Sequence, residues 1–145
     1  MIALIFQENK VLLKTEKGAA LLAPALYMPT NERIQARAMA YAKNPLCQAF
    51  FALNGDVPVG LCIVQPGNQQ AEILALAVAE EQRKQGIGRR MIAHVHTKLM
   101  LPLIAETDDD AVGFYRRCGF SVTSLGEKYP GIIRYRCILS KEACL

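Results

Sequence analysis

The sequence contains no apolar run long enough to cross a membrane and no pair of cysteines spaced to share a metal ion. Its cysteines are odd in number and scattered, at Cys47, Cys62, Cys118, Cys137 and Cys144. That distribution gives no support to a disulfide framework or a zinc site and favours a reducing compartment. The N-terminal residues place no basic region ahead of an apolar stretch, so we expect no signal peptide and a cytoplasmic protein.

Long runs of like charge and low-complexity tracts are also missing. Hydrophobic residues make up 52% of the 145 residues and charged residues 21%, which is typical of a folded domain rather than a disordered tail. The net charge of +4 suits a polyanionic small molecule but falls short of the basic face of a nucleic-acid binder. We therefore expect one domain covering residues 1–145, with neither nucleic acid nor membrane as a partner.

The apolar pattern predicts mostly strands in the first half of the chain and then alternating strands and helices. Thr30–Lys43 is predicted to be a helix, and Asn54-Gly55 is a favoured turn pair between two strands. The first thirty residues are weakly patterned, with a candidate edge strand at Met1–Gln7. Further strands are predicted at Gln48–Leu53, Val57–Val64, Ala71–Val78, Leu101–Glu106, Phe120–Ser124 and Ile132–Leu139, helices at Gly86–Met100 and Asp108–Arg117, and a loop at Leu125–Gly131.

Two glycines lie where the strand at 71–78 gives way to the next helix. Gly86 and Gly88 let the backbone turn tightly and approach a ligand without a Cβ in the way. The free N–H groups of the helix's first turn then form an anion site, and basic side chains surround it at Arg83, Lys84, Arg89 and Arg90. A pyrophosphate requires this chemistry, although a solvated loop that happens to contain two glycines is an alternative for these residues alone.

Two better-known phosphate loops are excluded. A Walker loop ends in Gly-Lys-Ser/Thr, whereas Gly88 is followed by Arg89 and Arg90. The dinucleotide fingerprint G-x-G-x-x-G fails because Met91 stands where the third glycine belongs.

The segment from Arg83 to Gly88 resembles the signature Q/R-x-x-G-x-G/A of the GNAT superfamily of N-acetyltransferases. A second segment, Asp108–Phe120, is similar to the family pattern N-x-x-A-x-x-F-Y-x-x-x-G-F. Every anchor of that pattern is present except the first, where Asp108 replaces asparagine, and both residues cap helices well. The two matches together cover about the last half of the chain.

The resemblance implies an α/β (α+β) fold in one N-acetyltransferase domain. It implies a mixed, mostly antiparallel sheet of about six to seven strands with flanking helices and a central strand–helix unit that binds the coenzyme. It also implies acetyl-coenzyme A as the cosubstrate, with no metal. The pantetheine arm would pair with the strand before the glycine loop, and the pyrophosphate would lie on the loop. The residues expected to bind the coenzyme are Leu76, Ala77, Val78, Arg83, Lys84, Gln85, Gly86, Ile87, Gly88, Arg89 and Arg90.

Direct attack of an amine on the thioester asks for a neutral nucleophile and an acid that protonates the departing thiolate. Tyr115 is the candidate acid, because the family tyrosine at this position often points at the coenzyme sulfur; the alternative is a core aromatic residue packed like Phe114 and Phe120. Glu72 is the candidate base, because its spacing from Gly86 resembles that of the catalytic glutamate in the histone-acetylating branch. The alternative is a glutamate in water at the end of a strand, with a chain of water molecules as the base.

Three other groups are interpreted as structural. His94 and His96 lie two residues apart on a helix, so they face different directions and cannot form an i, i+4 metal pair. Asp108–Asp110 are explained by helix capping at least as well as by a magnesium site. Cys118 has no accompanying His–Asn/Asp arrangement that would make it a nucleophile.

The sequence thus predicts an N-acetyltransferase acting on a primary amine of a small molecule or peptide. A coenzyme-binding regulatory module without turnover is the alternative, since one fold hosts many functions. The resemblance places the acceptor against two segments, Leu22–Arg33 and Gly126–Gly131, the second of which includes Glu127, Lys128 and Tyr129. Neither has a cluster of carboxylates that would single out a polyamine or an aminoglycoside. A homodimer is a further implication of the resemblance.

Overall fold

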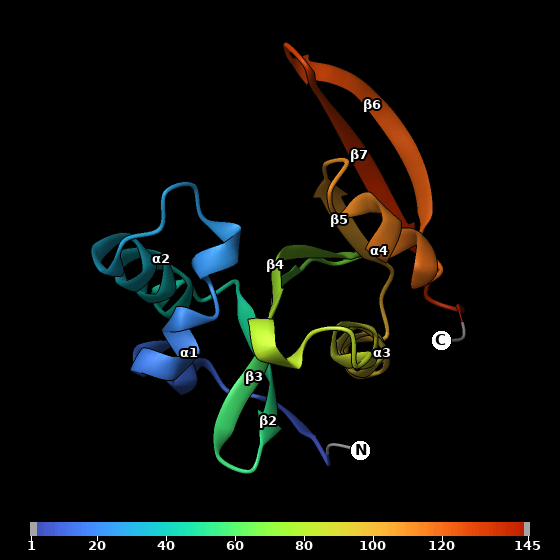
Figure 1. Ribbon diagram of the computed structural model, residues 1–145. Coiled ribbons are helices and arrows are strands. Elements are labelled where there is room, and N and C mark those ends of the chain that lie inside the picture. The colour runs from blue at the N-terminus through green and yellow to red at the C-terminus, as the bar shows by residue number, and fades with distance from the viewer. Residues whose placement is uncertain (1–2, 144–145) are drawn as a thin grey trace.

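The computed structural model describes residues 3–143, and within them one sheet of seven strands runs through the molecule (Figure 1). The strands are β1 (Ile5–Glu8), β2 (Gln48–Asn54), β3 (Val57–Pro66), β4 (Ala71–Val78), β5 (Leu103–Thr107), β6 (Ser121–Tyr129) and β7 (Ile132–Leu139). Their order across the sheet is β1-β2-β3-β4-β5-β7-β6, and neighbours are antiparallel except for β4 and β5, which pair in parallel. The predicted mixed, mostly antiparallel sheet is therefore confirmed.

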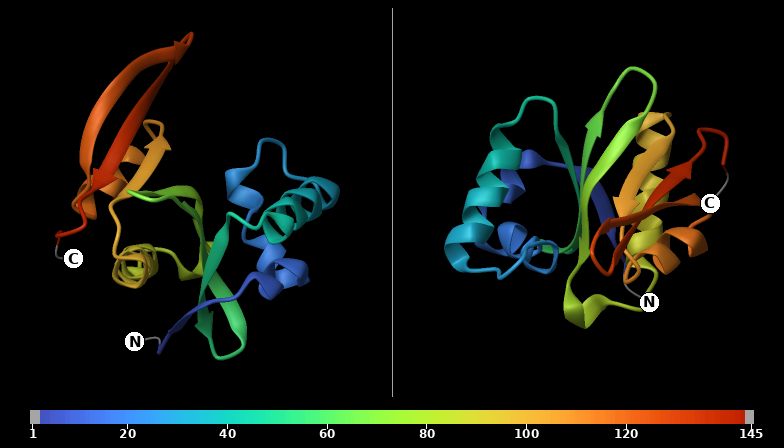
Figure 2. Two further views of the ribbon diagram at one scale, coloured as in Figure 1. Left: turned by 180° about the vertical axis from the view of Figure 1, so that it is seen from behind. Right: turned by 90° about the horizontal axis from the view of Figure 1, so that it is seen from above.

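Helices pack on both faces of this sheet (Figures 1 and 2). One face carries α1 (Glu16–Ala20) and α2 (Asn31–Lys43), and the other carries α3 (Ile87–Leu99) and α4 (Val112–Arg117). Short 3-10 helices lie at η1 (Lys10–Lys14), η2 (Ala23–Ala25) and η3 (Glu80–Gln82). Each face has its own apolar core, so burial on both sides holds the central strands in place.

Local signals in the sequence fix the ends of several elements. The Thr30 side chain accepts a hydrogen bond from the Arg33 N–H at 3.2 Å, which caps α2, and the helix stops before Asn44-Pro45. The turn between β2 and β3 contains Gly55 at a φ of +63°, as the Asn-Gly pair predicted. Strand β4 spans the predicted range Ala71–Val78.

Strand β4 contains a bulge that no local pattern predicted. On β3, Ile63 pairs with Ala75 and Val64 pairs with Ile73, which leaves Leu74 as the extra residue of β4. A bulge shifts the alternation of side chains by one residue, so the two halves of β4 follow different parities.

The bulge decides which β4 side chains face α3. Before it, Ala71 and Ile73 are buried in the core beside α3; after it, Leu76 and Val78 pack against that same core. Glu72 lies between the first two residues and therefore points to the opposite face, where its side chain is exposed.

Strands β4 and β5 separate soon after they begin (Figure 1). They pair only at Ala71 with Leu103 and at Glu72 with Ile104, and both then run on without pairing to each other. The sheet consequently opens into a wedge between its two halves.

Two predictions for the C-terminal half are wrong in extent. The helix predicted at Asp108–Arg117 begins only at Val112, because Asp108 Oδ1 accepts the N–H groups of Asp110 and Ala111, at 3.0 and 3.3 Å, and holds the chain in a turn. The loop predicted at Leu125–Gly131 is mostly strand, since β6 continues to Tyr129. The pairing shifts register twice along this stretch, and Gly126, with a φ of +82°, allows one of the shifts.

The N-terminal segment is more ordered than its pattern indicated. Strand β1 forms the edge of the sheet beside β2, and the part of the predicted edge strand at residues 1–2 lies outside the described residues. The Phe6 ring stacks on His94 of α3, with 5.4 Å between the ring centroids, and the guanidinium carbon of Arg90 lies 5.2 Å from the Phe6 centroid. These contacts attach β1 to α3.

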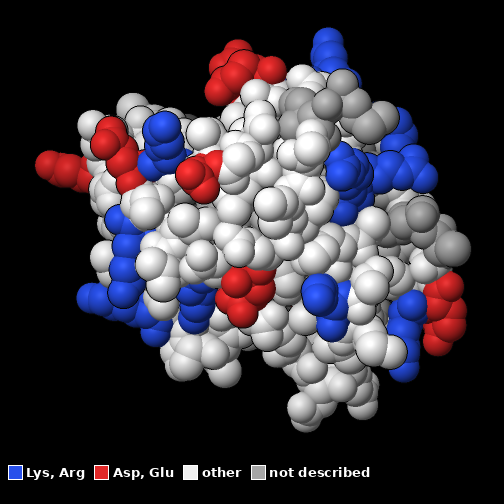
Figure 3. All heavy atoms as spheres, turned by 90° about the horizontal axis from the view of Figure 1, so that it is seen from below, with Lys and Arg blue, Asp and Glu red and all other residues white. Residues whose placement is uncertain are grey.

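No helix in the described part of the chain is long and apolar enough to cross a membrane. On the face drawn in Figure 3, lysine and arginine side chains are interspersed with acidic and uncharged ones. The positive charge visible there is dispersed rather than gathered into a continuous tract.

Candidate active site

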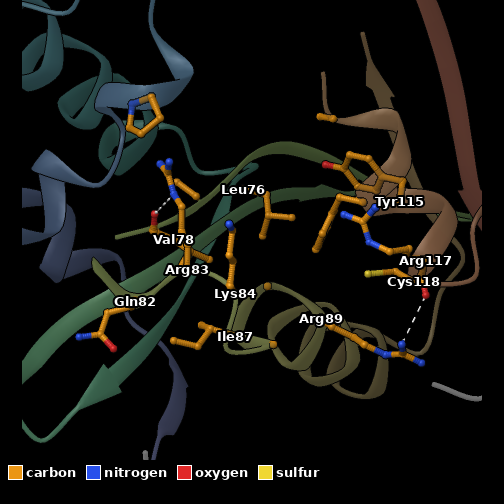
Figure 4. A pocket seen from close by; sticks show the side chains of 16 residues that line it. Leu76, Val78, Gln82, Arg83, Lys84, Ile87, Arg89, Tyr115, Arg117 and Cys118 are labelled. Carbon is orange, nitrogen blue, oxygen red and sulfur yellow. Dashed lines mark hydrogen bonds between the residues drawn. The ribbon is translucent and has the colours of Figure 1, made fainter. Parts of the chain in front are cut away.

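A cavity of about 630 Å³ lies between β4, the N-terminus of α3 and α4 (Figure 4). The predicted coenzyme-binding residues that line it are Leu76, Ala77, Val78, Arg83, Lys84, Gly86, Ile87, Gly88 and Arg89. Gln85 and Arg90 do not line it, and Arg90 instead lies over the Phe6 ring. The tertiary structure therefore brings most of the predicted set around one space.

The N-terminus of α3 borders this cavity. Gly86 precedes the helix with a φ of +77°, a conformation that side chains with a Cβ rarely adopt. The Arg90 N–H donates to the Gly86 carbonyl at 3.0 Å, so the N–H groups of Ile87, Gly88 and Arg89 have no acceptor within the helix. Among the described residues no side chain caps this end. The free amides and the positive end of the helix dipole are the features from which the sequence predicted an anion site.

Gly88 is required for a different reason. A Cβ built on it would lie 3.0 Å from Cε1 and 3.1 Å from Cζ of Phe114, closer than ordinary carbon contacts. The missing side chain thus lets α3 pack directly against the ring of Phe114 on α4. The two glycines of the motif serve two separate functions, one in backbone conformation and one in helix packing.

The charged side chains that line the cavity are all cationic: Arg83, Lys84, Arg89 and Arg117. Figure 4 shows Lys84 and Arg117 directed into the space between β4 and α4. Arg89 is partly engaged, because its Nη1 donates to the Arg117 carbonyl at 3.4 Å. Arg117 was not predicted as a lining residue, although it stands only two residues after Tyr115, because a sequence does not show which face of a short helix meets a cavity.

The main chain of β4 offers fewer free groups than predicted. The Ala79 N–H donates to the Val59 carbonyl at 2.8 Å, and hydrogen-bonded pairs alternate along an antiparallel ladder. Ala77 is therefore committed to β3, whereas Leu76 and Val78 direct their N–H and C=O groups towards the open side. Of these groups, the Val78 carbonyl already accepts a hydrogen bond from Arg83 Nε at 3.1 Å.

Tyr115 lies at the end of the cavity nearest the wedge between β4 and β5. Its ring is edge-on to Phe114 and Phe120, with centroid distances of 5.2 and 5.1 Å, and only 7% of the residue is exposed. Its hydroxyl points towards the side of the cavity where Leu76 lies (Figure 4). Burial raises the pKa of the Tyr115 phenol, and nearby thiols add to the effect, so the group stays protonated near neutral pH. The ring is packed as a core aromatic residue would be, and the hydroxyl faces the cavity as an acid would, so the position of Tyr115 is compatible with both interpretations.

Glu72 is not one of the residues that line the cavity. It occupies the second position of β4, on the face of the sheet away from α3, and it is exposed. Its exposure agrees with the alternative of a glutamate in water at the end of a strand. Its place beside Ile104, at the point where β4 and β5 separate, still puts it at the mouth of the wedge.

The remaining residues singled out in the sequence have structural contacts. Asp109 Oδ1 accepts a hydrogen bond from the Tyr135 hydroxyl at 2.6 Å, which ties the turn before α4 to β7. His96 Nε2 lies 2.8 Å from the Ser140 carbonyl. Cys118 lines the cavity as a buried free thiol, and burial raises its pKa in spite of Arg89 and the neighbouring Arg117.

Pro24, which lies in the first predicted acceptor segment, Leu22–Arg33, lines the cavity. The lining residues that were not predicted are Gln82, Ala111, Phe114, Arg117 and Cys118. The side chain of Gln82 stands out among them. Its Oε1 atom is buried and accepts no hydrogen bond from the described residues, and its amide points away from the space into which Lys84 is directed (Figure 4). Nothing in the local sequence around Gln82 distinguished it.

The second predicted acceptor segment belongs to the β6–β7 hairpin. Glu127 Oε1 accepts the Gly131 N–H and so closes the turn, and the Lys128 ammonium lies 3.1 Å from Glu106 Oε1 of β5. Tyr129 is 64% exposed. Lys128 is thus directed back over the sheet, whereas Glu127 has a structural contact.

Residues 45–122, more than half of the chain, match the family model described as "Acetyltransferase (GNAT) domain". The chain belongs to the GNAT family of acetyltransferases. The motifs, the glycine-led helix and the parted strands β4 and β5 fall within or next to the matched range, and the expected family is confirmed.

Relatives of this GNAT chain agree with that assignment. It is 32% identical over 83 residues to the peptidyl-lysine N-acetyltransferase YjaB of Salmonella typhimurium, an alignment that covers 52% of this chain and 54% of the relative. The chain therefore spans about half the length of the curated relative that it matches.

Solved structures show the same GNAT fold at low sequence identity. The aminoglycoside 6′-N-acetyltransferase of Enterococcus faecium has a TM-score of 0.77 at 18% identity, covering 97% of this chain and 99% of that one. A GNAT family acetyltransferase of Elizabethkingia anophelis, solved with acetyl-CoA bound, has a TM-score of 0.69 at 19% identity, covering 94% and 97%. These likenesses extend the fold assignment to nearly the whole chain.

Proposed function

We propose that this chain is an N-acetyltransferase that moves an acetyl group from acetyl-coenzyme A to a primary amine by direct attack in a ternary complex. The observation that carries the proposal is the layout of one cavity. A cationic helix N-terminus lies at one end, and a protonated, inward-pointing Tyr115 hydroxyl lies near the wedge at the other. No finding favours the alternative of a coenzyme-binding module without turnover.

The lining residues fit the chemistry of coenzyme A group by group. Its pyrophosphate matches the free amides of Ile87, Gly88 and Arg89, with Lys84 and Arg117 as counter-charges. The cationic lining and the uncapped amides make this end suited to a polyanion.

The pantetheine arm carries amide groups, and the cavity wall offers partners for them. The main chain of Leu76 faces the open side of β4 and is free to pair with them. The Val78 carbonyl becomes available only when Arg83 releases it. We therefore expect Arg83 to change its hydrogen bond when the coenzyme binds.

Catalysis then needs two proton movements. As the neutral amine attacks the thioester carbon and the C–S bond breaks, Tyr115 gives its proton to the departing thiolate sulfur. The amine loses a proton on the opposite face of the sheet, where Glu72 stands in contact with solvent and can receive it directly or through water. Because Glu72 is exposed, we expect Glu72→Gln to affect the rate less than Tyr115→Phe does.

Three further statements belong to the proposal. The acceptor is a primary amine of a small molecule or peptide, and the peptidyl-lysine activity named for the sequence relative is of the second kind. The location is the reducing cytoplasm, which suits the buried free thiols of Cys47, Cys62, Cys118 and Cys137. Two copies pair in solution, which light scattering of the purified protein tests directly.

The test combines binding and turnover. Acetyl-coenzyme A is titrated into the protein by calorimetry, and thiol release is then followed with a panel of primary amines. Tyr115→Phe should lower kcat by about 100-fold or more while leaving the coenzyme Kd unchanged within about twofold. Tyr41→Phe, which removes a phenol from α2 outside the cavity, is the matched control.

Each outcome separates the candidate functions. Binding with thiol release supports the proposal, and an unchanged kcat in Tyr115→Phe removes that residue's role. Binding without release for any amine favours the non-catalytic module. If no coenzyme binds, the anion site at α3 has another ligand and the proposal fails.

A further inference from the structure

The sheet face opposite the cavity is open beyond β4. On that face α1 and α2 cover the β2–β3 side, and no helix is drawn over β5 and β7 (Figures 1 and 2). Ile138 on β7 is 38% exposed there. Because the coenzyme would fill the cavity on the α3 side, an amine reaches the thioester through the wedge from this open face.

Strand register identifies the side chains on that face. Glu72 pairs with Ile104, so both point to the same side, and Glu106 follows two residues later on β5. The antiparallel partner of Glu106 is Arg136 of β7, and Arg134 lies two residues before it on the same face. We call Glu72, Glu106, Arg134 and Arg136, together with Lys128, the acceptor face.

Cations outnumber carboxylates on the acceptor face. Glu106 Oε1 lies 3.1 Å from the Lys128 ammonium and 3.9 Å from Arg134 Nε, so this carboxylate is already occupied. Among the ion pairs of the described residues none involves Arg136. The long contact to Arg134 leaves most N–H groups of its guanidinium free, because only Nε approaches Glu106. The guanidinium groups of Arg134 and Arg136 are therefore available to bind an anion beside the wedge.

From this arrangement we infer that the acceptor amine carries a carboxylate of its own, as in an amino acid or an acidic peptide. The carboxylate binds Arg134 and Arg136, and the amine lies at the wedge beside Glu72. A planar guanidinium binds a carboxylate through two parallel hydrogen bonds, which fixes orientation as well as adding affinity. The inference rests on the proposed function, because it names the acceptor class of the same site.

The same charges disfavour polycationic acceptors. An amine approaches as an ammonium, and a second or third positive charge on it would meet Arg134, Arg136 and Lys128, with Glu106 already paired. Positive charge close to the reacting amine therefore weakens binding to the acceptor face, which disfavours polyamines and aminoglycosides as acceptors.

The test uses acceptors that share one amine and differ in one carboxylate. The first pair is the amide-capped dipeptides Ala-Glu and Ala-Gln, and the second is alanine and alaninamide. We expect KM to be lower by about tenfold or more for the carboxylate member, the effect of a charge-assisted hydrogen bond of about 1.5 kcal/mol. In Arg134→Gln and Arg136→Gln the ratio of the two KM values within each pair should fall towards one. Lys141→Gln, which removes an exposed cation elsewhere, should keep the preference.

Binding without turnover gives an independent readout. Calorimetry of each dipeptide with protein saturated by coenzyme A measures the same preference, and the coenzyme Kd of each variant confirms a folded cavity. Equal KM and Kd within both pairs, or a preference that survives both arginine substitutions, overturns the inference. If thiol is released from no amine, the proposed function fails, and the calorimetric preference still decides for or against the carboxylate site.

Discussion

Replacing Gly88 by alanine tests whether packing between α3 and α4 builds the cavity. The new Cβ would lie 3.0 and 3.1 Å from two ring atoms of Phe114, and 3.9 Å from Cγ2 of Val78. The Phe114 ring must then shift by a few tenths of an ångström. Because it lies edge-on to Tyr115 at 5.2 Å, such a shift also disturbs the candidate acid.

Two opposing effects set the size of the change. Overpacking a well-packed site costs about 1–3 kcal/mol. Alanine is a better helix former than glycine by at most about 1 kcal/mol, which offsets part of that cost. We expect a net loss of about 1–2 kcal/mol, with the melting temperature falling by about 2–4 °C for each kcal/mol.

The assay is a double-mutant cycle with Phe114→Leu, which removes both of the ring atoms that the new Cβ approaches. Thermal unfolding and the coenzyme Kd are measured for the parent, both single variants and the double variant. In the Phe114→Leu background Gly88→Ala should be neutral or slightly stabilising, because the clash is gone and the gain in helix propensity is kept. An equal cost in both backgrounds would refute the packing argument.

Three further predictions concern conformation and pH. Gly86→Ala should lower the free energy of unfolding by about 1 kcal/mol in chemical denaturation, because Gly86 has a φ of +77°, and Gly86→Asn should cost less; equal costs would contradict this. Burial raises the pKa of Tyr115 above the ordinary value of 10.0, so the hydroxyl should stay protonated up to that pH. Any fall of kcat with rising pH below 10.0 should therefore also be present in Tyr115→Phe. Burial lowers the pKa of His94, which lies against Phe6 and Phe50, so the stability from its neutral ring is present above 6.5 and lost as the pH falls through the folded-state pKa. The free energy of unfolding of His94→Leu should then depend less on pH in acid, and an unchanged dependence would count against this role.

The fold was predictable where neighbouring residues decide the structure. Thr30 and Asn44-Pro45 delimit α2, and Gly86 starts α3, because caps and breakers act within one turn of chain. The loop predicted at Leu125–Gly131 was wrong because its local signal, a glycine, is compatible with two structures. Gly126 favours a loop, yet pairing with β7 turns its positive φ into a bulge inside β6.

Some residues of the candidate site were likewise predictable from local sequence, and others were not. Gly86, Gly88 and Tyr115 were identified as candidates because each belongs to a short motif along the chain, and all three line one cavity. Arg117 and Gln82 were missed because their contribution depends on which surface α4 and η3 present to β4. Glu72 was placed on the correct strand, and its exposure agrees with one of the two alternatives that the sequence left open.

The sequence by itself determined the family, the order of the main strands and helices from Thr30 onwards, and the glycine turn before α3, since each depends on residues close together in the chain. Only the tertiary structure decided which face each side chain occupies. The bulge at Leu74 places Glu72 opposite Leu76, although simple alternation would put them on one face. The parting of β4 from β5 and the meeting of Glu106 with Lys128 likewise arise from pairing between distant segments. Such pairing is set by the packing of the whole sheet, which local sequence does not encode.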